Sequence, residues 1–191
     1  MQLLEERIRN EGKILPGNIV KIDGFLNHRV DTSLLRAMAK EFGKHFDLSD
    51  LTAVLTVEAS GIALATICAE EFHVPMLFAK KAKSDNIEGG LYQSEIYSYT
   101  YKKKVTLLLS KEWIKPGDRI LIIDDFLANG EALRGLIELV EQAGAKCVGI
   151  GVAVEKGFQP GGARIRAEGY DLMSLAIIDS ADENGFKFRE Q

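Results

Sequence analysis

Two kinds of hydrophobic pattern alternate along this chain. Short apolar, β-branched runs predict strands, whereas apolar residues spaced three or four positions apart predict helices. Strands are predicted over residues 51–57, 74–79, 119–124, 146–154 and 172–178. Helices are predicted over residues 1–10, 31–46, 62–72 and 131–143, with a helical turn over 164–169. Such alternation favours an α/β domain with a mainly parallel central sheet, whose ligands bind at the carboxyl ends of the strands.

The segment from residue 80 to residue 110 departs from this alternation. Residues 80–90 are polar and end in two glycines, which predicts an exposed and mobile loop. Residues 91–101 alternate and are rich in tyrosine, and a second apolar run covers residues 105–110. These two runs predict an antiparallel hairpin that follows the loop.

Composition and charge narrow the class of protein. The 191 residues are 46% hydrophobic and 27% charged, which suits one globular domain over residues 1–191. The net charge of −4 gives no overall attraction to nucleic acid or to anionic membranes. The two cysteines, Cys68 and Cys147, lie in apolar surroundings and are too few for a disulfide scaffold. Because the chain also lacks a signal-peptide pattern and an apolar run of membrane-spanning length, we expect a cytoplasmic protein.

The strongest chemical signal lies in residues 120–132. A run of four apolar residues, typical of a strand buried on both faces, is followed by Asp124 and Asp125. A short loop over residues 126–130 then leads into the next predicted helix. Backbone N–H groups of such a loop and the positive end of the helix form an anion site, and Gly130 allows the positive φ that it requires. Paired carboxylates beside an anion site match the hydroxyls and the phosphate of a ribose 5-phosphate.

Other interpretations of these residues stay open at this point. The two aspartates alone are equally compatible with a strand end that caps the next helix. A magnesium site of the Walker B type is a second alternative, although the chain contains no Gly-x-x-x-x-Gly-Lys-Ser/Thr sequence. The pair Gly149 and Gly151 lacks the third glycine and the following helix of a dinucleotide fingerprint, so we interpret it as close packing within a strand.

With its four apolar residues, two aspartates and small-residue loop, the 120–132 segment resembles the phosphoribosyl diphosphate (PRPP) motif of the type I phosphoribosyltransferases. The likeness extends over nearly the whole chain. Three further segments are similar to the xanthine-specific branch of that family: Phe25-Leu26-Asn27-His28, residues 57–62 and residues 154–161. The resemblance implies the type I phosphoribosyltransferase fold, in which residues 1–30 contribute to a base-binding hood and residues 80–110 form the flexible loop and hairpin.

The resemblance also implies which residues bind PRPP. Asp124 and Asp125 would hold the ribose hydroxyls as the catalytic residues, and Ser60 and Gly61 would contact the diphosphate. The 5-phosphate would lie on five consecutive residues, namely Ala128, Asn129, Gly130, Glu131 and Ala132. Threonines often occupy this loop elsewhere in the family, so here we expect backbone N–H groups, more than side chains, to hold the phosphate. The flexible loop adds three candidate cations for the diphosphate: Lys80, Lys81 and Lys83.

A second set of residues matches the xanthine contacts of the family, namely Val20, Asn27 and Lys156. The Lys156 ammonium is a suitable donor to an exocyclic oxo group of xanthine. Asn27 offers both a donor and an acceptor, and Val20 could contribute through its backbone. Without the family, Lys156 would be interpreted as a surface charge. Phe158 could stack on the purine or belong to the core.

The activity implied by the resemblance is transfer of the 5-phosphoribosyl group from PRPP to xanthine, which yields xanthosine 5′-monophosphate and diphosphate. Mg²⁺ would be bound mainly through PRPP and diphosphate, so we expect no metal cluster in the protein. We further expect a homodimer, and neither a nucleic-acid nor a membrane partner. Two alternatives remain, which are another purine specificity and a PRPP-sensing regulator without catalysis. The second is disfavoured because the chain has no added DNA-binding module and no positive net charge.

Overall fold

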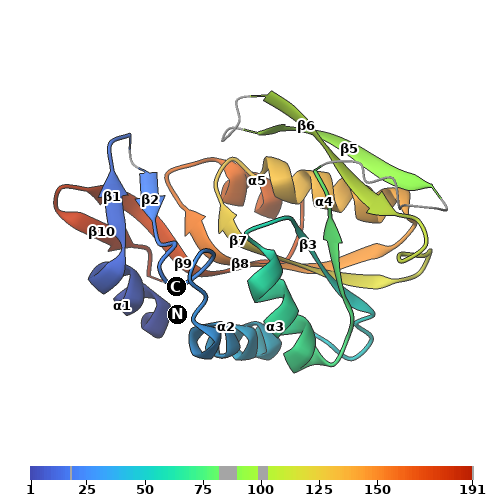
Figure 1. Ribbon diagram of the computed structural model, residues 1–191, viewed down its shortest axis with the longest axis horizontal. Coiled ribbons are helices and arrows are strands. Elements are labelled where there is room, and N and C mark those ends of the chain that lie inside the picture. Colours follow the sequence, from blue (N-terminus) through green and yellow to red (C-terminus); the bar gives the residue numbers. More distant parts are fainter. Residues whose placement is uncertain (18, 82–89, 99–102, 191) are drawn as a thin grey trace.

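The computed structural model describes residues 1–17, 19–81, 90–98 and 103–190 of the chain. A central sheet contains six strands: β3 (Ala53–Val57), β4 (Met76–Ala79), β7 (Arg119–Leu127), β8 (Lys146–Lys156), β9 (Leu172–Asp182) and β10 (Gly185–Phe188). Helices surround this sheet in Figure 1: α1 (Gln2–Glu11), α2 (Thr32–His45), α3 (Ile62–Phe72), α4 (Glu131–Gln142) and α5 (Gly161–Ala167). Two smaller sheets pair β1 (Lys13–Leu15) with β2 (Ile19–Lys21), and β5 (Leu91–Ser98) with β6 (Lys103–Ser110).

The strands of the central sheet are ordered β10-β9-β8-β7-β3-β4. Every neighbouring pair is parallel except β10 with β9. Helices α2 and α3 lie on one face of the sheet, and α4 and α5 lie on the other (Figure 1). The prediction of a mainly parallel sheet flanked by helices is therefore confirmed. Within the described ranges, no helix combines the length and the apolar character that a bilayer crossing requires.

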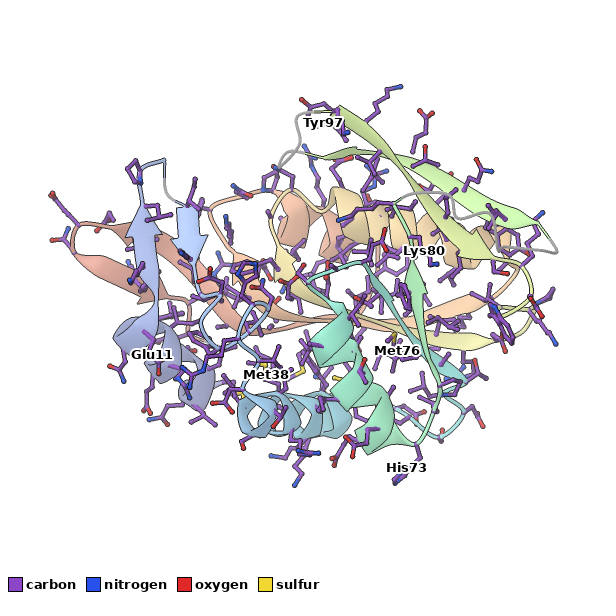
Figure 2. All side chains as sticks on the ribbon, in the orientation of Figure 1. Glu11, Met38, His73, Met76, Lys80 and Tyr97 are labelled. Atoms are coloured by element: carbon purple, nitrogen blue, oxygen red, sulfur yellow. The ribbon has the colours of Figure 1, made fainter. Side chains whose placement is uncertain are left out.

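The central strand β7 is buried on both faces because its side chains alternate between two cores. Leu121 and Ile123 pack in the core beneath α2 and α3, whereas Ile120 and Ile122 pack in the core beneath α4. All four side chains are fully buried. Figure 2 shows side chains filling the space on both sides of the sheet, with Met38 of α2 among them. A strand in this position places its carboxyl end at a fixed point between two packed layers.

Two strands, β7 and β8, are longer than the sequence predicts. The prediction that β7 ends at Asp124 is wrong, because Phe126 and Leu127 continue the strand and pair with Val154 and Glu155 of β8. The predicted loop over 126–130 is accordingly shorter. Strand β8 extends from the predicted end at Val154 to Lys156, which pairs with β9. The strand ends were predicted where polar residues begin. Both strands continue past those residues because their backbone groups form ladder hydrogen bonds with neighbouring strands.

The remaining differences lie at the edges of the fold. Strand β9 continues to Asp182 and turns back into β10, which the sequence did not predict. Strands β1 and β2 also form, on either side of a turn at Pro16 and Gly17. The predicted helical turn starts too late, because α5 begins at Gly161. Asp31 caps α2, since its side chain accepts hydrogen bonds from two backbone N–H groups in the first turn.

The predicted hairpin is confirmed as β5 and β6, which pair antiparallel. Residues 82–89 of the predicted flexible loop and residues 99–102 within the predicted hairpin segment lie outside the described residues. Lys80, labelled in Figure 2, forms an antiparallel bridge with Leu108 and so joins the end of β4 to the hairpin. The hairpin packs closely on α4 at Gly135, where a Cβ would lie 2.6 Å from Ile96 Cγ2 and 2.8 Å from Leu107 Cδ1.

The cysteines behave as core residues. Cys68 is fully buried and Cys147 is half-buried, and neither forms a disulfide. Burial raises the pKa of the Cys68 thiol and raises that of Cys147 to about 12. Both thiols therefore stay protonated near neutral pH, which removes the reactive thiolate form.

The glycine pair of β8 is explained by close packing, as predicted. A Cβ on Gly149 would lie 2.5 Å from Cδ1 of Phe46, and one on Gly151 would lie 2.7 Å from Cδ1 of Ile123. Both glycines therefore let the core beneath α2 approach the strand backbone.

We expect Gly149→Ala to lower the free energy of unfolding by about 1–3 kcal/mol, because the buried ring of Phe46 must move to accommodate the methyl group. Gly24→Ala is the control, since a Cβ there meets no atom within 4 Å. Denaturant titration followed by circular dichroism measures both variants. Equal stability of the Gly149→Ala and Gly24→Ala proteins would contradict the packing argument.

Candidate active site

Asp125 is the centre of a hydrogen-bonded cluster that joins three distant segments of the chain. Its Oδ1 accepts a hydrogen bond from Oγ of Ser60 at 2.9 Å, and its Oδ2 accepts one from Nδ2 of Asn27 at 2.7 Å. Ser60 lies between β3 and α3, and Asn27 lies in the turns that precede α2. The Asp125 side chain is buried, so these two donors replace the water that a carboxylate otherwise needs. Each hydrogen bond to a charged acceptor contributes about 1.5–3 kcal/mol.

Asp124 is equally buried, and its carboxylate lies against Gly61, the residue that follows Ser60. Its Oδ1 accepts the backbone N–H of Asp125 at 3.0 Å. A Cβ on Gly61 would lie 2.7 Å from this oxygen and would overlap Oγ1 of Thr56, so glycine is required where the loop crosses the carboxylate. Burial, and after it the nearby charge of Asp125, raises the pKa of Asp124 well above its usual range. Asp124 is thus a buried acid that a cation or hydroxyl donors would favour in its ionised form.

The loop over residues 58–61 also contacts the chain just after β4. The backbone N–H of Lys81 donates to Oε1 of Glu58 at 2.5 Å, and the Glu58–Ala59 peptide bond is cis. The positive charge of Lys81 also acts on Asp124, where it opposes the rise in pKa. A lysine at the start of the predicted flexible loop therefore lies near the carboxylate pair.

The predicted 5-phosphate loop forms the turn between β7 and α4. Gly130 adopts φ = 87° and is the N-cap of α4, which has no side-chain cap. The first N–H groups of this 12-residue helix are therefore available to an anion. The loop is supported by α5, since the N–H of Gly161 donates to the carbonyl oxygen of Ala128 at 3.1 Å.

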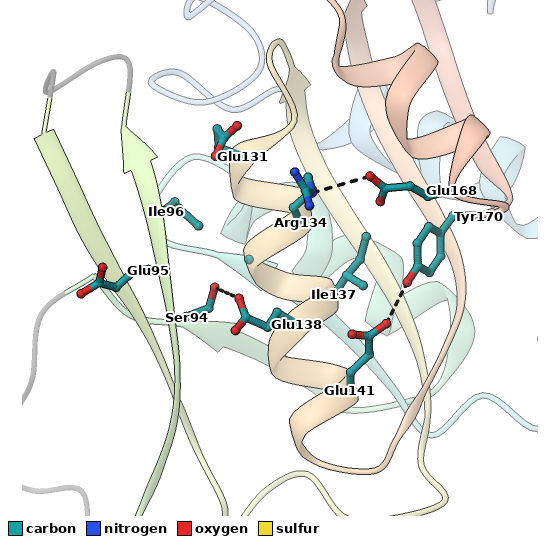
Figure 3. Close-up of a pocket in the computed structure, with 11 residues that line it drawn as sticks. Ser94, Glu95, Ile96, Glu131, Arg134, Ile137, Glu138, Glu141, Glu168 and Tyr170 are labelled. Carbon is teal, nitrogen blue, oxygen red and sulfur yellow. Dashed lines mark hydrogen bonds and ion pairs between the residues drawn. The ribbon is translucent and has the colours of Figure 1, made fainter.

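The Glu131 side chain turns to the outer face of α4, as expected for a carboxylate next to a phosphate site. It lines a pocket of about 360 Å³ between α4, the β5–β6 hairpin and the end of α5 (Figure 3). Carboxylates predominate in this pocket, where Arg134 lies 3.7 Å from Glu168 and Glu138 accepts a hydrogen bond from Ser94. An acidic pocket repels phosphates, so the candidate active site lies at the carboxyl ends of β3 and β7 instead.

Lys156 is the last residue of β8 and is half-buried. Its Nζ lies 5.8 Å from the centroid of the Phe126 ring, and burial lowers the pKa of its ammonium group. None of the ion pairs found among the described residues involves Lys156. Phe158, which follows shortly after, is 40% exposed and so does not belong to the core.

Not every predicted residue takes part in these contacts. Asn27, Ser60 and Asp125 are joined directly, and Gly61 lies on Asp124. By contrast, the Val20 side chain is buried in the core that also lies beneath α2 and α3, which leaves its backbone as the group that could meet a ligand. Lys83 lies outside the described residues.

Sequence reasoning missed two buried polar groups next to these segments. Thr56, on β3, has a hydroxyl that is buried without a hydrogen-bond partner among the described atoms. Glu155 is buried beside the phosphate loop and pairs with Arg166 of α5. The available signal was a single glutamate within the apolar run of β8, followed by an arginine on the next helix.

Comparison with known proteins agrees with this geometry. Residues 31–188 match the model of the family described as "Phosphoribosyl transferase domain". A protein of Bifidobacterium animalis subsp. lactis, named xanthine phosphoribosyltransferase, is 52% identical over 95% of each chain. A protein of the same name from Lachnoclostridium phytofermentans is 52% identical over 99% of this chain and 98% of its own.

Solved structures share the fold. Adenine phosphoribosyltransferase of Giardia lamblia, in complex with 9-deazaadenine, superposes with a TM-score of 0.77 at 26% identity, over 91% of this chain and 96% of the other. The adenine phosphoribosyltransferase of Rhodothermus marinus gives 0.74 at 21% identity, over 93% and 100%. The predicted type I phosphoribosyltransferase fold is therefore confirmed. With the family model, the close relatives and the fold in agreement, this chain belongs to the phosphoribosyltransferase family.

Proposed function

We propose that this chain transfers the 5-phosphoribosyl group of PRPP to xanthine and releases diphosphate and xanthosine 5′-monophosphate. Relatives that are about half identical over nearly their whole length carry the name of that activity. The observation that carries the site assignment is the cluster of Asp125 with Ser60 and Asn27. It brings a carboxylate for the ribose, a donor for the diphosphate and an amide for the base to one point.

In this proposal Asp124 and Asp125 bind the ribose hydroxyls. A hydroxyl that donates to Asp125 can replace Ser60 or Asn27 with a bond of similar strength, so binding exchanges partners without exposing a buried charge. Ser60, once released, is free to donate to the diphosphate together with the N–H of Gly61. The hydrogen bonds from Ser60 and Asn27 thus fix the direction in which the carboxylate points.

The 5-phosphate lies on residues 128–132 in this proposal, held mainly by backbone N–H groups. The uncapped N-terminus of α4 and the positive φ of Gly130 support this role. The chain is acidic overall, so local geometry has to supply the attraction. Asn129 is the side chain of this loop that can add a donor.

Phosphoribosyltransferases generally use Mg²⁺ with PRPP. The buried carboxylates of Asp124 and Asp125 are oxygen ligands of the kind that Mg²⁺ prefers, so the donor set fits the ion. Among the described residues, no group of three or more His, Cys, Asp or Glu side chains is arranged to hold a metal. We therefore propose that the ion binds chiefly to PRPP and diphosphate, where its charge stabilises the departing diphosphate.

For the base, we propose that Lys156, Asn27 and the backbone of Val20 select xanthine. A half-buried ammonium that forms no ion pair with any described residue gains most from a ligand that accepts its hydrogen bond. The oxo groups of xanthine are such acceptors, whereas the amino group of adenine is not. The exposed ring of Phe158 is available to stack on the purine.

The chemistry then follows from positioning. A ring nitrogen of xanthine forms a bond to C1 of the ribose and loses its proton, while the bond from C1 to diphosphate breaks and its electron pair leaves with diphosphate. The transition state expected in this family is oxocarbenium-like, so orientation and water exclusion matter most. Closure of residues 80–101 over the reactants, a base-binding hood over residues 1–30, a homodimeric assembly and a cytoplasmic location stay predictions.

Diphosphate release on mixing the protein, Mg²⁺ and PRPP with single purine bases tests the proposed function. We expect turnover with xanthine to exceed that with hypoxanthine, guanine and adenine. Preference for another base would contradict the substrate assignment. PRPP binding without diphosphate release would instead indicate a regulator.

Replacing both carboxylates, in Asp124→Asn with Asp125→Asn, should lower kcat/KM for PRPP by about 100-fold or more, because the amides keep the shape but remove the charge at the ribose and the metal. Asp50→Asn, at an exposed aspartate, is the control and should leave kcat/KM unchanged. Steady-state kinetics on proteins with matched circular dichroism spectra measures the effect. Full activity in the double variant would rule out the ribose-binding role.

Lys156→Ala should weaken the use of xanthine by about 10- to 100-fold while PRPP binding stays close to that of the wild type, since a charged hydrogen bond to the base is lost. Lys146→Ala, at the exposed opposite end of β8, is the matched control. The measurements are KM for xanthine and the dissociation constant of PRPP. Loss of PRPP affinity with an unchanged base preference would show that Lys156 does not read the base.

A further inference from the structure

We propose that Arg166 is a positioning residue for the 5-phosphate loop, because its ion pair with Glu155 holds α5 in the place where α5 supports residues 128–130. The inference rests on the proposed function, since it requires that this loop binds the 5-phosphate. Arg166 itself touches neither the loop nor the carboxylate pair in the contacts described above. Its effect would pass through α5.

The ion pair has the geometry of a strong, directional contact. Nη1 of Arg166 lies 3.0 Å from Oε1 of Glu155, and Nη2 lies 2.8 Å from Oε2. The hydroxyl of Ser174, on β9, also donates to Oε2. The Glu155 side chain is only 3% exposed, whereas that of Arg166 is 37% exposed. Burial alone would raise the pKa of Glu155, but the bonds from Arg166 and Ser174 outweigh it and lower the pKa. Glu155 is therefore a buried anion that depends on its partners.

Close packing at two glycines makes the position of α5 sensitive to this pair. A Cβ on Gly162 would overlap the Glu155 carboxylate and would lie 2.8 Å from Nη1 of Arg166. A Cβ on Gly161 would overlap the carbonyl oxygen of Ala128 and would lie 2.7 Å from the N atom of Gly130. One face of the first turn of α5 thus lies on the ion pair, and another lies on the phosphate loop.

The contact between α5 and the loop is made by backbone atoms. The N–H of Gly161 donates to the Ala128 carbonyl at 3.1 Å, and a Cβ on Gly130 would lie 3.2 Å from the Cα of Gly161. If backbone N–H groups of the loop hold the phosphate, the direction in which they point depends on α5, which packs against the loop. A shift of α5 would therefore turn these donors without altering any residue that touches the ligand.

Helix α5 has little intrinsic stability with which to resist such a shift. It has seven residues, far fewer than an isolated helix needs, and contains two glycines in its first turn. Its apolar anchor is Ile165, which is fully buried in the core beneath α4. The ion pair of Arg166 with Glu155 is the second contact that holds α5. It acts next to the phosphate loop, because Glu155 pairs with Leu127, the residue immediately before that loop.

The test compares two ligands that report on different loops. In Arg166→Met we expect the affinity for ribose 5-phosphate to fall roughly tenfold, as is typical when a residue that orients ligand contacts is removed, while the affinity for inorganic diphosphate stays unchanged. Arg166→Lys keeps the charge and one donor, so its loss should be smaller. Arg164→Met, on the same helix and without an ion pair among the described residues, is the matched control. Isothermal titration calorimetry on the full chain measures both affinities, and thermal unfolding is recorded in parallel.

Gly161→Ala tests the same link from the loop side. Its methyl group displaces the loop while the ion pair stays intact, so it should also weaken ribose 5-phosphate binding selectively. It keeps the proposal testable if Arg166→Met does not fold. A selective loss in these variants, with Arg164→Met unaffected, supports the proposal.

Two results would overturn the positioning role. One is an equal loss of affinity for ribose 5-phosphate and diphosphate, which indicates general destabilisation. The other is a lowered melting temperature with unchanged ribose 5-phosphate binding. Failure of the wild-type chain to bind ribose 5-phosphate is a different outcome, because it would overturn the proposed phosphate loop and this inference with it.

Discussion

Burial of β7 on both faces is the constraint on which the rest of the structure depends. Its apolar residues are shared alternately between the core beneath α2 and α3 and the core beneath α4, so the strand cannot slide or rotate without emptying one of them. The carboxyl end of such a strand is fixed relative to both layers. Asp124, Asp125 and the loop into α4 begin at this point, which is why the loops beside it can form a site with defined geometry.

Buried charge organises the surroundings of that strand end. Asp125 and Glu155 are both buried carboxylates, and each is held by donors from other segments. Asp124 and Lys156 differ, because burial shifts each of their pKa values towards the neutral form. Glu155 thus belongs to the framework, whereas Asp124, Asp125 and Lys156 lie where the proposed substrates would bind. A ligand that supplies hydrogen-bond partners to Asp124 and Lys156 offsets the cost of burying their charged forms.

The candidate site combines residues inside and outside the range that the family model matches. The family model matches residues 31–188, which contain the carboxylate pair and the proposed phosphate loop. Asn27 and Val20 precede that range, in the segment that forms β1, β2 and the following turns. Enzymes named for adenine share the fold at 26% identity or less, as in Giardia lamblia and Rhodothermus marinus. The hydrogen bond from Asn27 to Asp125 links this N-terminal segment to the end of β7.

The sequence by itself determined the alternation of strands and helices, the buried strand before the two aspartates and the small-residue loop after them, because these follow from local periodicity and from residue type. It also determined that Gly149 and Gly151 serve packing. Only the tertiary structure decided that β7 continues to Leu127, that α5 begins at Gly161 and that β10 forms. The partners of Asp125 and Glu155 were likewise decided there. Hydrogen bonds and ion pairs between residues far apart in sequence depend on how the layers of the fold pack together. The local pattern of residues does not contain that information.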